Sequence, residues 1–341
     1  MNIVYNCDDY YTPHTAVSIV SLFENNKSEK EICVYILGNG ISRKSMQRFA
    51  AMEAAYTSDN YVRKITVLDL ADFEAALKLL IGDSLDAGRF TVTALARIFA
   101  PQHLPDEVER YLYLDCDTAV TGSLHALFET GLEGKVCGMA AEPTIYREVP
   151  AYLGLGQGTP YFNTGMMLVD RSAWEEAGIT KACVDYYREH NGRLPLSDQD
   201  VLNHCLAGKV MPLWQGWDFF SNYYYRSYKS LVSQNAWYEK IQTADEYDRA
   251  RKTPAVIHFA GDERPWIRGN HNPWKKIYRE YLQKTPWKDT PETAGQEGRM
   301  LLYHLMNLVT GICPAIRIGI SEYYYRKHLA PGAPGRETSN T

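Results

Sequence analysis

Residues 111–117 read Tyr-Leu-Tyr-Leu-Asp-Cys-Asp, and the interpretation of the whole chain starts from them. Four apolar or aromatic residues form a strand-like run that ends on two carboxylates, Asp115 and Asp117, one residue apart. Carboxylate oxygens are hard ligands that suit Mg²⁺ or Mn²⁺, and such ions commonly bridge a protein to the phosphates of a substrate. A solvated turn after a strand has the same Asp-x-Asp pattern, so the rest of the chain must decide between the two interpretations.

The first half of the chain alternates strand-like and helix-like segments. Apolar strand patterns cover residues 3–6, 31–37, 64–68 and 110–114, and helical patterns cover residues 12–26 and the segments after Ser42 and Asp72. This alternation predicts right-handed βαβ units and therefore an α/β protein with a mainly parallel sheet. Ligands of such sheets bind beyond the carboxyl ends of the strands, where Asp8 and Asp9 follow the first strand and Asp115 follows the fourth.

The second half of the chain is less regular. Residues 161–170 and 254–259 have strand patterns, and residues 197–207 have a helical pattern with Ser197 as the expected N-cap. Prolines and glycines between residues 284 and 298 indicate a linker. We therefore expect a catalytic domain at residues 1–283, a linker at 284–298, and a helical tail at 299–341 that is rich in basic and aromatic residues.

The composition limits the class of protein. The chain has 341 residues, of which 45% are hydrophobic, and this suits one large domain with an appendage. A net charge of -5 argues against a general nucleic-acid binder. The seven cysteines are scattered and have no zinc-pair spacing, so we expect reduced core thiols in a cytoplasmic protein. Met1 leads directly into a strand pattern, so we expect no signal peptide, and no uncharged apolar run approaches the ~20 residues of a transmembrane helix.

A set of short motifs, in order, resembles glycosyltransferase family 8. This family contains retaining enzymes of the GT-A fold, a Rossmann-like fold, among them bacterial lipopolysaccharide galactosyl- and glucosyltransferases and glycogenin. The resemblance extends from Met1 to about Trp274. Its motifs are residues 3–11 (IVYNCDDYY), Ala96-Arg97, residues 112–117 (LYLDCD), residues 161–165 (YFNTG), Asp198-Gln199-Asp200, residues 258–261 (HFAG) and Arg264-Pro265-Trp266.

The resemblance implies a metal site and a nucleotide site. Asp115, Asp117 and His258 match the metal ligands, and their mixed oxygen and nitrogen donors suit Mn²⁺, with Mg²⁺ as the alternative. Asp8 matches the residue that hydrogen-bonds uracil, and Tyr11 matches the residue that stacks on it. Structural alternatives remain open. His258 could be a hydrogen-bonded histidine at a strand end without a ligand role, and the negative charge of Asp8 could stabilise the N-terminus of the following helix.

The resemblance also implies a donor-sugar site. Arg97, Asn163, Asp198 and Gln199 match residues around the sugar, whose hydroxyls pair with guanidinium, amide and carboxylate groups. Gln199 matches the position nearest the anomeric carbon. An amide oxygen is a poor nucleophile, so we hypothesise same-face attack by the acceptor, with Gln199 stabilising an oxocarbenium-like transition state. Asp200 is a further candidate catalytic residue whose role stays open. The remaining expected contacts to the nucleotide sugar are Cys116, Gly165, Gly261 and Arg264.

Several positions leave alternatives. Gly165 could let the backbone approach the ligand or could be a kink in a strand. Arg264 stands where family members often have a lysine that reaches the diphosphate, and arginine keeps the charge with a different fork. Glu142 is a candidate acceptor contact. Trp217 is another, although its aromatic stretch, residues 214–228, could equally be a loop that covers the core.

The expected function is that of a retaining hexosyltransferase. It would move glucose or galactose from a UDP-sugar to a hydroxyl of a glycan or glycolipid of the cell envelope, with Mn²⁺ stabilising the UDP leaving group. The alternatives are a catalytically idle sugar-nucleotide- or glycan-binding protein, and a haloacid-dehalogenase-like phosphatase, which places such a motif after its first strand. Nucleic acid is not expected as a partner. The basic and aromatic tail either contacts the inner face of the cytoplasmic membrane or packs back on the domain.

Overall fold

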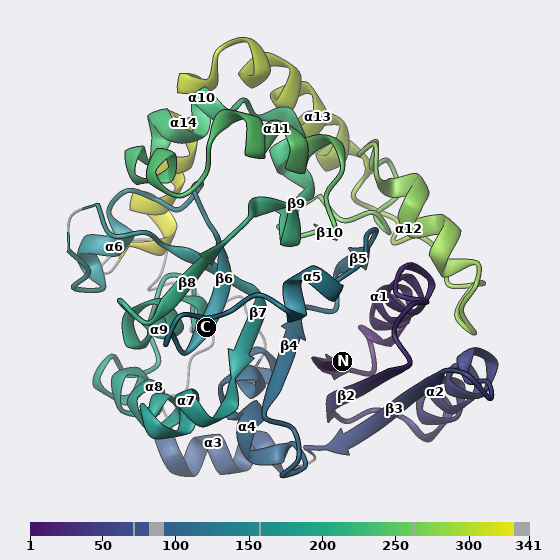
Figure 1. The fold of residues 1–341 in the computed structure, drawn as a ribbon. Helices are drawn as coiled ribbons and strands as arrows, with labels where there is room; N and C mark the ends of the chain where they lie inside the picture. Colours follow the sequence, from purple (N-terminus) through teal and green to yellow (C-terminus); the bar gives the residue numbers. More distant parts are fainter. Residues whose placement is uncertain (71, 82–91, 157, 262, 331–341) are drawn as a thin grey trace.

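The computed structural model describes residues 1–70, 72–81, 92–156, 158–261 and 263–330. A seven-stranded sheet forms the centre, and a three-stranded sheet lies beside it (Figure 1). In spatial order, the strands of the large sheet are β3 (Val62–Asp69), β2 (Glu31–Asn39), β1 (Asn2–Asp8), β4 (Arg110–Leu114), β7 (Phe162–Asp170), β6 (Cys137–Ala141) and β8 (Val210–Leu213). The small sheet consists of β5 (Thr118–Val120), β10 (Val256–His258) and β9 (Phe219–Phe220).

The large sheet is mainly parallel, as the alternating pattern predicts. β1 pairs in parallel with β2 and β4, β2 with β3, and β6 with β8. β7 is the exception, because it lies antiparallel between β4 and β6. Since β1 and β4 are parallel neighbours, the two acidic motifs that follow them lie at the same edge of the sheet.

Helices flank the sheet along most of the chain. The first group, in chain order, is α1 (Thr12–Asn25), α2 (Arg43–Tyr56), α3 (Phe73–Ile81), η1 (Val92–Phe99), α4 (Ala100–His103), α5 (His125–Phe128), α6 (Val149–Tyr152), α7 (Arg171–Glu176), α8 (Ile179–Glu189) and α9 (Asp198–Cys205). The second is η2 (Gln215–Trp217), η3 (Ser221–Tyr225), α10 (Tyr228–Gln234), η4 (Ala236–Lys240), α11 (Ala244–Lys252), α12 (Lys275–Leu282), α13 (Glu297–Ile312), α14 (Pro314–Tyr324) and η5 (Tyr325–Leu329).

The core is centred on the strands that position the acidic motifs. The side chains of Leu112, Leu114 and Leu168 are fully buried, as are those of Ile3 and Val4. Each aliphatic side chain of this size contributes about 1.5–3 kcal/mol when it is removed from water. The acidic loops at the sheet edge are therefore held by the most buried part of the fold.

Of the two serines predicted to cap helices, Ser42 does so and Ser197 does not. Ser42 caps α2, because its Oγ accepts a hydrogen bond of 3.2 Å from the amide of Ser45. The prediction for Ser197 is wrong. Its backbone has φ 49°, a left-handed conformation that is costly for a residue other than glycine, and its hydroxyl lies 3.1 Å from the Tyr187 hydroxyl instead of capping α9. The strained residue directly precedes Asp198.

The segment that we expected as a linker, residues 284–298, lies against the domain. Trp287 is buried, with its ring 5.0 Å from that of Phe49 and under the guanidinium of Arg48. Thr293 exchanges backbone hydrogen bonds with Trp266 and Arg268. These contacts fix where the tail begins relative to the sheet.

The tail forms the helices α13 and α14, which Figure 1 shows in yellow-green to yellow, and the short η5; α14 contacts α10. Arg147 and Tyr146 anchor its end, through a bond from the Arg147 amide to Glu322 and a stacked contact between Tyr146 and Tyr325. Among the described helices, none has the length and apolarity to cross a membrane. The outer side of α13 nevertheless exposes a set of apolar side chains: Leu301, Leu302, Leu305, Leu308 and Val309.

The cysteines are all free thiols. The expectation of core thiols is wrong for Cys313, which is exposed because it lies at the junction of α13 and α14, and Cys33 is only partly buried. The other cysteines are buried: Cys7, Cys116, Cys137, Cys183 and Cys205.

Candidate active site

The two acidic motifs border one large cleft, whose volume is about 1000 Å³. Strands β1 and β4 bring Asp8 and Asp115 to it, and β10 brings His258. Most of the residues that the motifs single out border this cleft although they are far apart in the sequence. They are Asp8, Tyr11, Arg97, Asp115, Cys116, Asp117, Glu142, Asn163, Asp198, Gln199, His258, Gly261 and Arg264.

Three of these side chains form a compact cluster of metal-ligand type. One donor atom from each of Asp115, Asp117 and His258 lies within 4.8 Å of the others. His258 Nε2 is 3.2 Å from an Asp117 oxygen and 3.7 Å from an Asp115 oxygen. Burial favours the neutral acid, but the charges of Arg264 and His258 hold the pKa of Asp117 below its usual range. The donor set fits a hard or borderline divalent cation.

Asp218 positions His258 and was not singled out from the sequence. Its Oδ1 is 2.9 Å from His258 Nδ1, and its side chain is fully buried. Burial alone would lower the pKa of His258, but the charges of Asp218 and Asp117 raise it well above its usual value. A carboxylate on one ring nitrogen turns the other toward the cluster, as is usual for metal-binding histidines. The available signal was an isolated acid within the aromatic stretch at residues 214–228.

Gly165 makes room for the cluster. A Cβ atom added to Gly165 would lie 2.2 Å from His258 Cε1 and 2.8 Å from an Asp115 oxygen. Its carbonyl also accepts a 2.7 Å hydrogen bond from the Asp115 amide. Gly165 lies on β7, behind the cleft, so its role is to allow the metal-ligand side chains to approach the backbone.

Arg97 connects the cluster to the predicted sugar site. From η1 its buried guanidinium reaches Asp115 at 2.9 Å and Asp198 at 3.0 Å, and it also donates to the carbonyl of Thr164 at 2.8 Å. Burial raises the pKa of Asp198 to about 6, and the charge of Arg97 opposes that rise. Arg97 therefore holds together two carboxylates that would otherwise repel each other.

Gln199, Asn163 and Glu142 form one polar network in the same wall. Asn163 Nδ2 donates to Gln199 Oε1 at 2.8 Å and lies 3.4 Å from Glu142 Oε2. Glu142 Oε1 accepts a 2.9 Å hydrogen bond from the Tyr223 hydroxyl, and burial raises the pKa of Glu142. The network fixes the direction of the Gln199 amide.

Besides Gly165, two more predicted residues do not border the cleft. Asp200 is fully buried and accepts hydrogen bonds from the Tyr161 hydroxyl at 2.6 Å and the Leu196 amide at 2.7 Å. Trp217 packs edge-on against Trp214. Asp200 thus holds the start of α9, and Trp217 belongs to the packing around η2.

The nucleotide end of the cleft contains the remaining predicted contacts. Asp8 accepts a 2.9 Å hydrogen bond from the Tyr11 amide, and the Cys116 thiol donates to the Asn6 carbonyl at 2.8 Å. Arg264 bonds to the Asp117 carboxylate, and its Nε donates to the carbonyl of Gly261 at 2.9 Å. Arg264 thus provides a positive charge directly beside the metal-ligand cluster.

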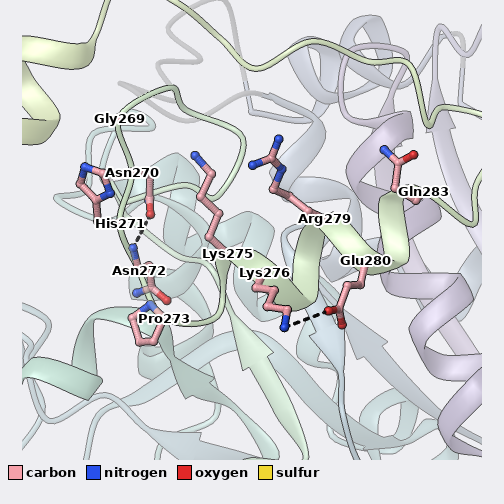
Figure 2. Close-up of a pocket in the computed structure, with 10 residues that line it drawn as sticks. All are labelled: Gly269, Asn270, His271, Asn272, Pro273, Lys275, Lys276, Arg279, Glu280 and Gln283. Carbon is pink, nitrogen blue, oxygen red and sulfur yellow. Dashed lines mark hydrogen bonds and ion pairs between the residues drawn. The ribbon is translucent and has the colours of Figure 1, made fainter.

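Figure 2 shows a second hollow, of about 660 Å³, beside α12. Three cations border it, but each is paired with a carboxylate: Lys275 and Arg279 with Glu292, and Lys276 with Glu280. No residue predicted to act in catalysis lies there. The chemistry therefore belongs to the large cleft.

Comparison with known proteins identifies the family of the chain. Residues 2–269 match the model of glycosyl transferase family 8. General stress protein A of Bacillus subtilis is 26% identical, with 84% of this chain and 94% of that protein covered. A lipopolysaccharide 1,2-glucosyltransferase of Escherichia coli K12 is 27% identical, with 96% and 92% covered. The structure of the galactosyltransferase LgtC with donor and acceptor sugar analogues superposes with a TM-score of 0.67 at 24% identity, covering 88% of this chain and 99% of LgtC. The chain therefore belongs to glycosyltransferase family 8 and has the GT-A fold.

Proposed function

We propose that this glycosyltransferase moves glucose or galactose from a UDP-sugar to a hydroxyl of a glycan or glycolipid, with retention of configuration and with Mn²⁺ as the cofactor. The main support is the Asp115–Asp117–His258 cluster in a cleft bordered by the family motifs. Relatives named as lipopolysaccharide 1,2-glucosyltransferase and 1,3-galactosyltransferase favour a hexose and a cell-envelope acceptor.

The cluster and its surroundings fit a divalent cation. Two carboxylates and one imidazole face each other, Gly165 leaves room for them, and Asp218 orients the imidazole. When bound, the ion would stabilise negative charge on the departing diphosphate as a Lewis acid. Mixed oxygen and nitrogen donors favour Mn²⁺, and Mg²⁺ is the alternative.

The residues of the chain then have distinct tasks in transfer. Arg264 supplies positive charge for the diphosphate, and Asp198 and Asn163 hold the sugar hydroxyls, with Arg97 orienting Asp198. Gln199 presents an amide fixed by Asn163 to the anomeric carbon, where it stabilises an oxocarbenium-like transition state. The acceptor hydroxyl attacks the anomeric carbon from the face that UDP leaves, as the bond to UDP breaks, and its proton passes to the departing diphosphate, so the configuration is retained without a covalent intermediate.

An idle binding protein is the alternative to this enzyme. It would be expected to have lost part of the metal-ligand cluster, whereas all three ligands are in place. The phosphatase alternative is withdrawn, because the Asp-x-Asp motif follows β4 and the chain belongs to family 8.

The test is UDP release from a panel of UDP-sugars, with Mn²⁺ or with a chelator. We expect slow hydrolysis of one donor that requires the metal and disappears in Asp117→Ala. Asp106→Ala, which removes a fully exposed carboxylate, is the control and should keep the activity. If no donor is hydrolysed yet UDP binds with Mn²⁺, the enzyme requires its acceptor. Metal-independent release, or no UDP binding at all, contradicts the proposal.

We also propose that the protein is cytoplasmic and that α13 lies on the inner face of the cytoplasmic membrane. The exposed apolar side chains of α13, together with basic residues such as Arg326 and Lys327 in the tail, suit a surface of anionic lipid. Leu305 and Leu308 are 55% and 67% exposed, so the double change to glutamate should preserve the fold. It should abolish flotation with phosphatidylglycerol vesicles, and undiminished flotation would contradict the proposal.

A further inference from the structure

One part of the cleft, which we call its tail end, is bordered by the C-terminal helices. The tail residues that border it are Tyr303 and Asn307 of α13 and Arg317 and Tyr324 of α14. Arg226 of the catalytic domain borders the same cleft. Among the residues that the structure describes, the carboxylates that border the cleft come from the catalytic domain: Asp8, Asp115, Asp117, Glu142 and Asp198. The tail contributes cations and neutral polar groups to this end of the cleft.

Among the described residues, the hydrogen-bond partners of Arg226 and Arg317 are neutral. Arg226 is 9% exposed, and its Nη1 donates to Gln234 Oε1 at 2.9 Å while its buried Nε has no partner. Arg317 donates to Asn307 Oδ1 at 2.6 Å and to the Tyr303 hydroxyl at 3.4 Å. Within the part of the chain that the structure describes, neither arginine forms an ion pair with a carboxylate.

The two arginines affect each other electrostatically. The pKa of Arg226 is lowered to about 10, first by burial and then by the charge of Arg317. Glu263 also experiences the charge of Arg317, but it forms no ion pair with it, and burial raises the pKa of Glu263 to about 7. Two neighbouring guanidinium groups, one of them buried, are costly without a counter-ion.

Further polar atoms at this end have no partner. Asn307 Nδ2 is buried without a hydrogen-bond acceptor, although Asn307 Oδ1 is held by Arg317. A free amide donor and a free Arg226 Nε beside the charge of Arg317 form a donor set without an acceptor. Guanidinium groups bind phosphate and carboxylate through paired N–H bonds. An oxyanion would therefore supply the hydrogen-bond acceptor that these donors lack.

We propose that Arg226, Arg317 and Asn307 bind an anionic group, a phosphate or a carboxylate, on the acceptor glycan. The inference rests on the proposed function, because it assigns the acceptor to the part of the cleft that the C-terminal helices border. An anionic acceptor would supply the missing counter-ion. A neutral glycan would leave the buried charge uncompensated, so the same residues would also discriminate between acceptors.

The test is calorimetric binding of glucose, glucose 6-phosphate and glucuronic acid to the full chain. Mn²⁺ and saturating UDP are present, so that the diphosphate site is filled before the sugar is added. We expect at least one of the anionic sugars to bind about tenfold or more tightly than glucose, with the preferred sugar separating phosphate from carboxylate. The preference should weaken as salt is raised.

Variants of the tail complete the test. Arg317 is only partly buried, so Arg317→Gln should fold and reduce the preference for the anionic sugar about tenfold, whereas Arg317→Lys should keep part of it. Arg326→Gln is the matched control, because Arg326 is exposed on the same tail, is paired with Glu148, and should not affect binding. Equal affinity for all three sugars, no measurable binding of the anionic ones, or the same loss in the control overturns the inference. Failure of UDP itself to bind would instead contradict the proposed function.

Discussion

The two halves of the cleft differ in the partners of their arginines. In the proposed donor half, which contains the Asp115–Asp117–His258 cluster, the two arginines Arg97 and Arg264 each pair with a carboxylate. In the proposed acceptor half, formed by Arg226, Arg317 and Asn307, the described hydrogen-bond partners of the arginines are neutral. A metal ion and a diphosphate bring charges of both signs. They can therefore replace the partners in a network where each arginine is already paired with a carboxylate. Two arginines without a carboxylate partner instead favour a ligand that is negatively charged.

The largest effect is expected from Gly165→Ala, which tests how closely the donor half is packed. The added Cβ would overlap His258 and the Asp115 carboxylate, at 2.2 and 2.8 Å. Mn²⁺-dependent UDP binding should fall on the order of 100-fold, because displacement of the ligands by about 1 Å disrupts the site. Calorimetry with UDP and Mn²⁺ measures it.

Gly319→Ala is the matched control. An added Cβ at this α14 position meets no atom within 4 Å, so binding should not change and the helix should gain about 0.5–1 kcal/mol. Normal UDP binding in Gly165→Ala would mean that the cluster tolerates the displacement, and the account of the donor half would be wrong.

A smaller effect is expected from Asp218→Asn, which removes the charge that orients His258. Mn²⁺ affinity should fall about 10–100-fold, the usual effect of losing such a partner. Electron paramagnetic resonance of free Mn²⁺ measures the affinity. Asp200→Asn is the comparison, since Asp200 is equally buried but holds α9. It should lower the thermal midpoint and leave Mn²⁺ affinity unchanged. Equal Mn²⁺ affinity in the Asp218 variant and the wild type would contradict the positioning role.

The smallest effect concerns Glu263, the buried carboxylate that experiences the charge of Arg317. Burial raises its pKa from 4.5 to about 7, so between these values the folded protein binds more protons than the unfolded chain. The contribution of Glu263 to stability is therefore fully present below about pH 4.5 and is lost as the pH rises to about 7. Urea unfolding of the wild type should show a loss of about 1–2 kcal/mol from this group between pH 5 and pH 7.

Glu263→Gln should remove that part of the pH dependence, because the amide does not titrate. If the free energy of unfolding of this variant differs between pH 5 and pH 7 as much as that of the wild type, Glu263 is ionised throughout this range. It would then be a counter-ion for Arg317, and the contrast between the two halves would be weaker.

The donor half could be predicted from the sequence because its residues occur in short motifs attached to strands. The carboxyl ends of β1 and β4 had to meet, so Asp8 and Asp115 could be placed from the strand pattern alone. The proposed ligand role of His258 came from the family resemblance and not from the strand pattern. Asp218 was not predicted, since the single acid in an aromatic stretch indicates nothing about the distant His258 that it contacts.

The acceptor half could not be predicted in this way. Arg226 follows η3 and Arg317 lies on α14, ninety-one residues later in the sequence, so only tertiary packing brings them together. The Ser197 cap was wrong for a related reason. The segment has a typical capping sequence, but Asp200 binds the Leu196 amide and the backbone of Ser197 adopts positive φ.

The central claim is that Asp115, Asp117 and His258 hold a metal ion that recruits a uridine diphosphate. Calorimetric titration of the full chain with UDP, in Mn²⁺ and again in a chelator, tests it most directly. The account predicts binding that requires Mn²⁺, falls on the order of 100-fold or more in Asp117→Ala, and is unchanged in the exposed control Asp106→Ala. Binding of equal strength in the chelator, or in Asp117→Ala, would contradict it.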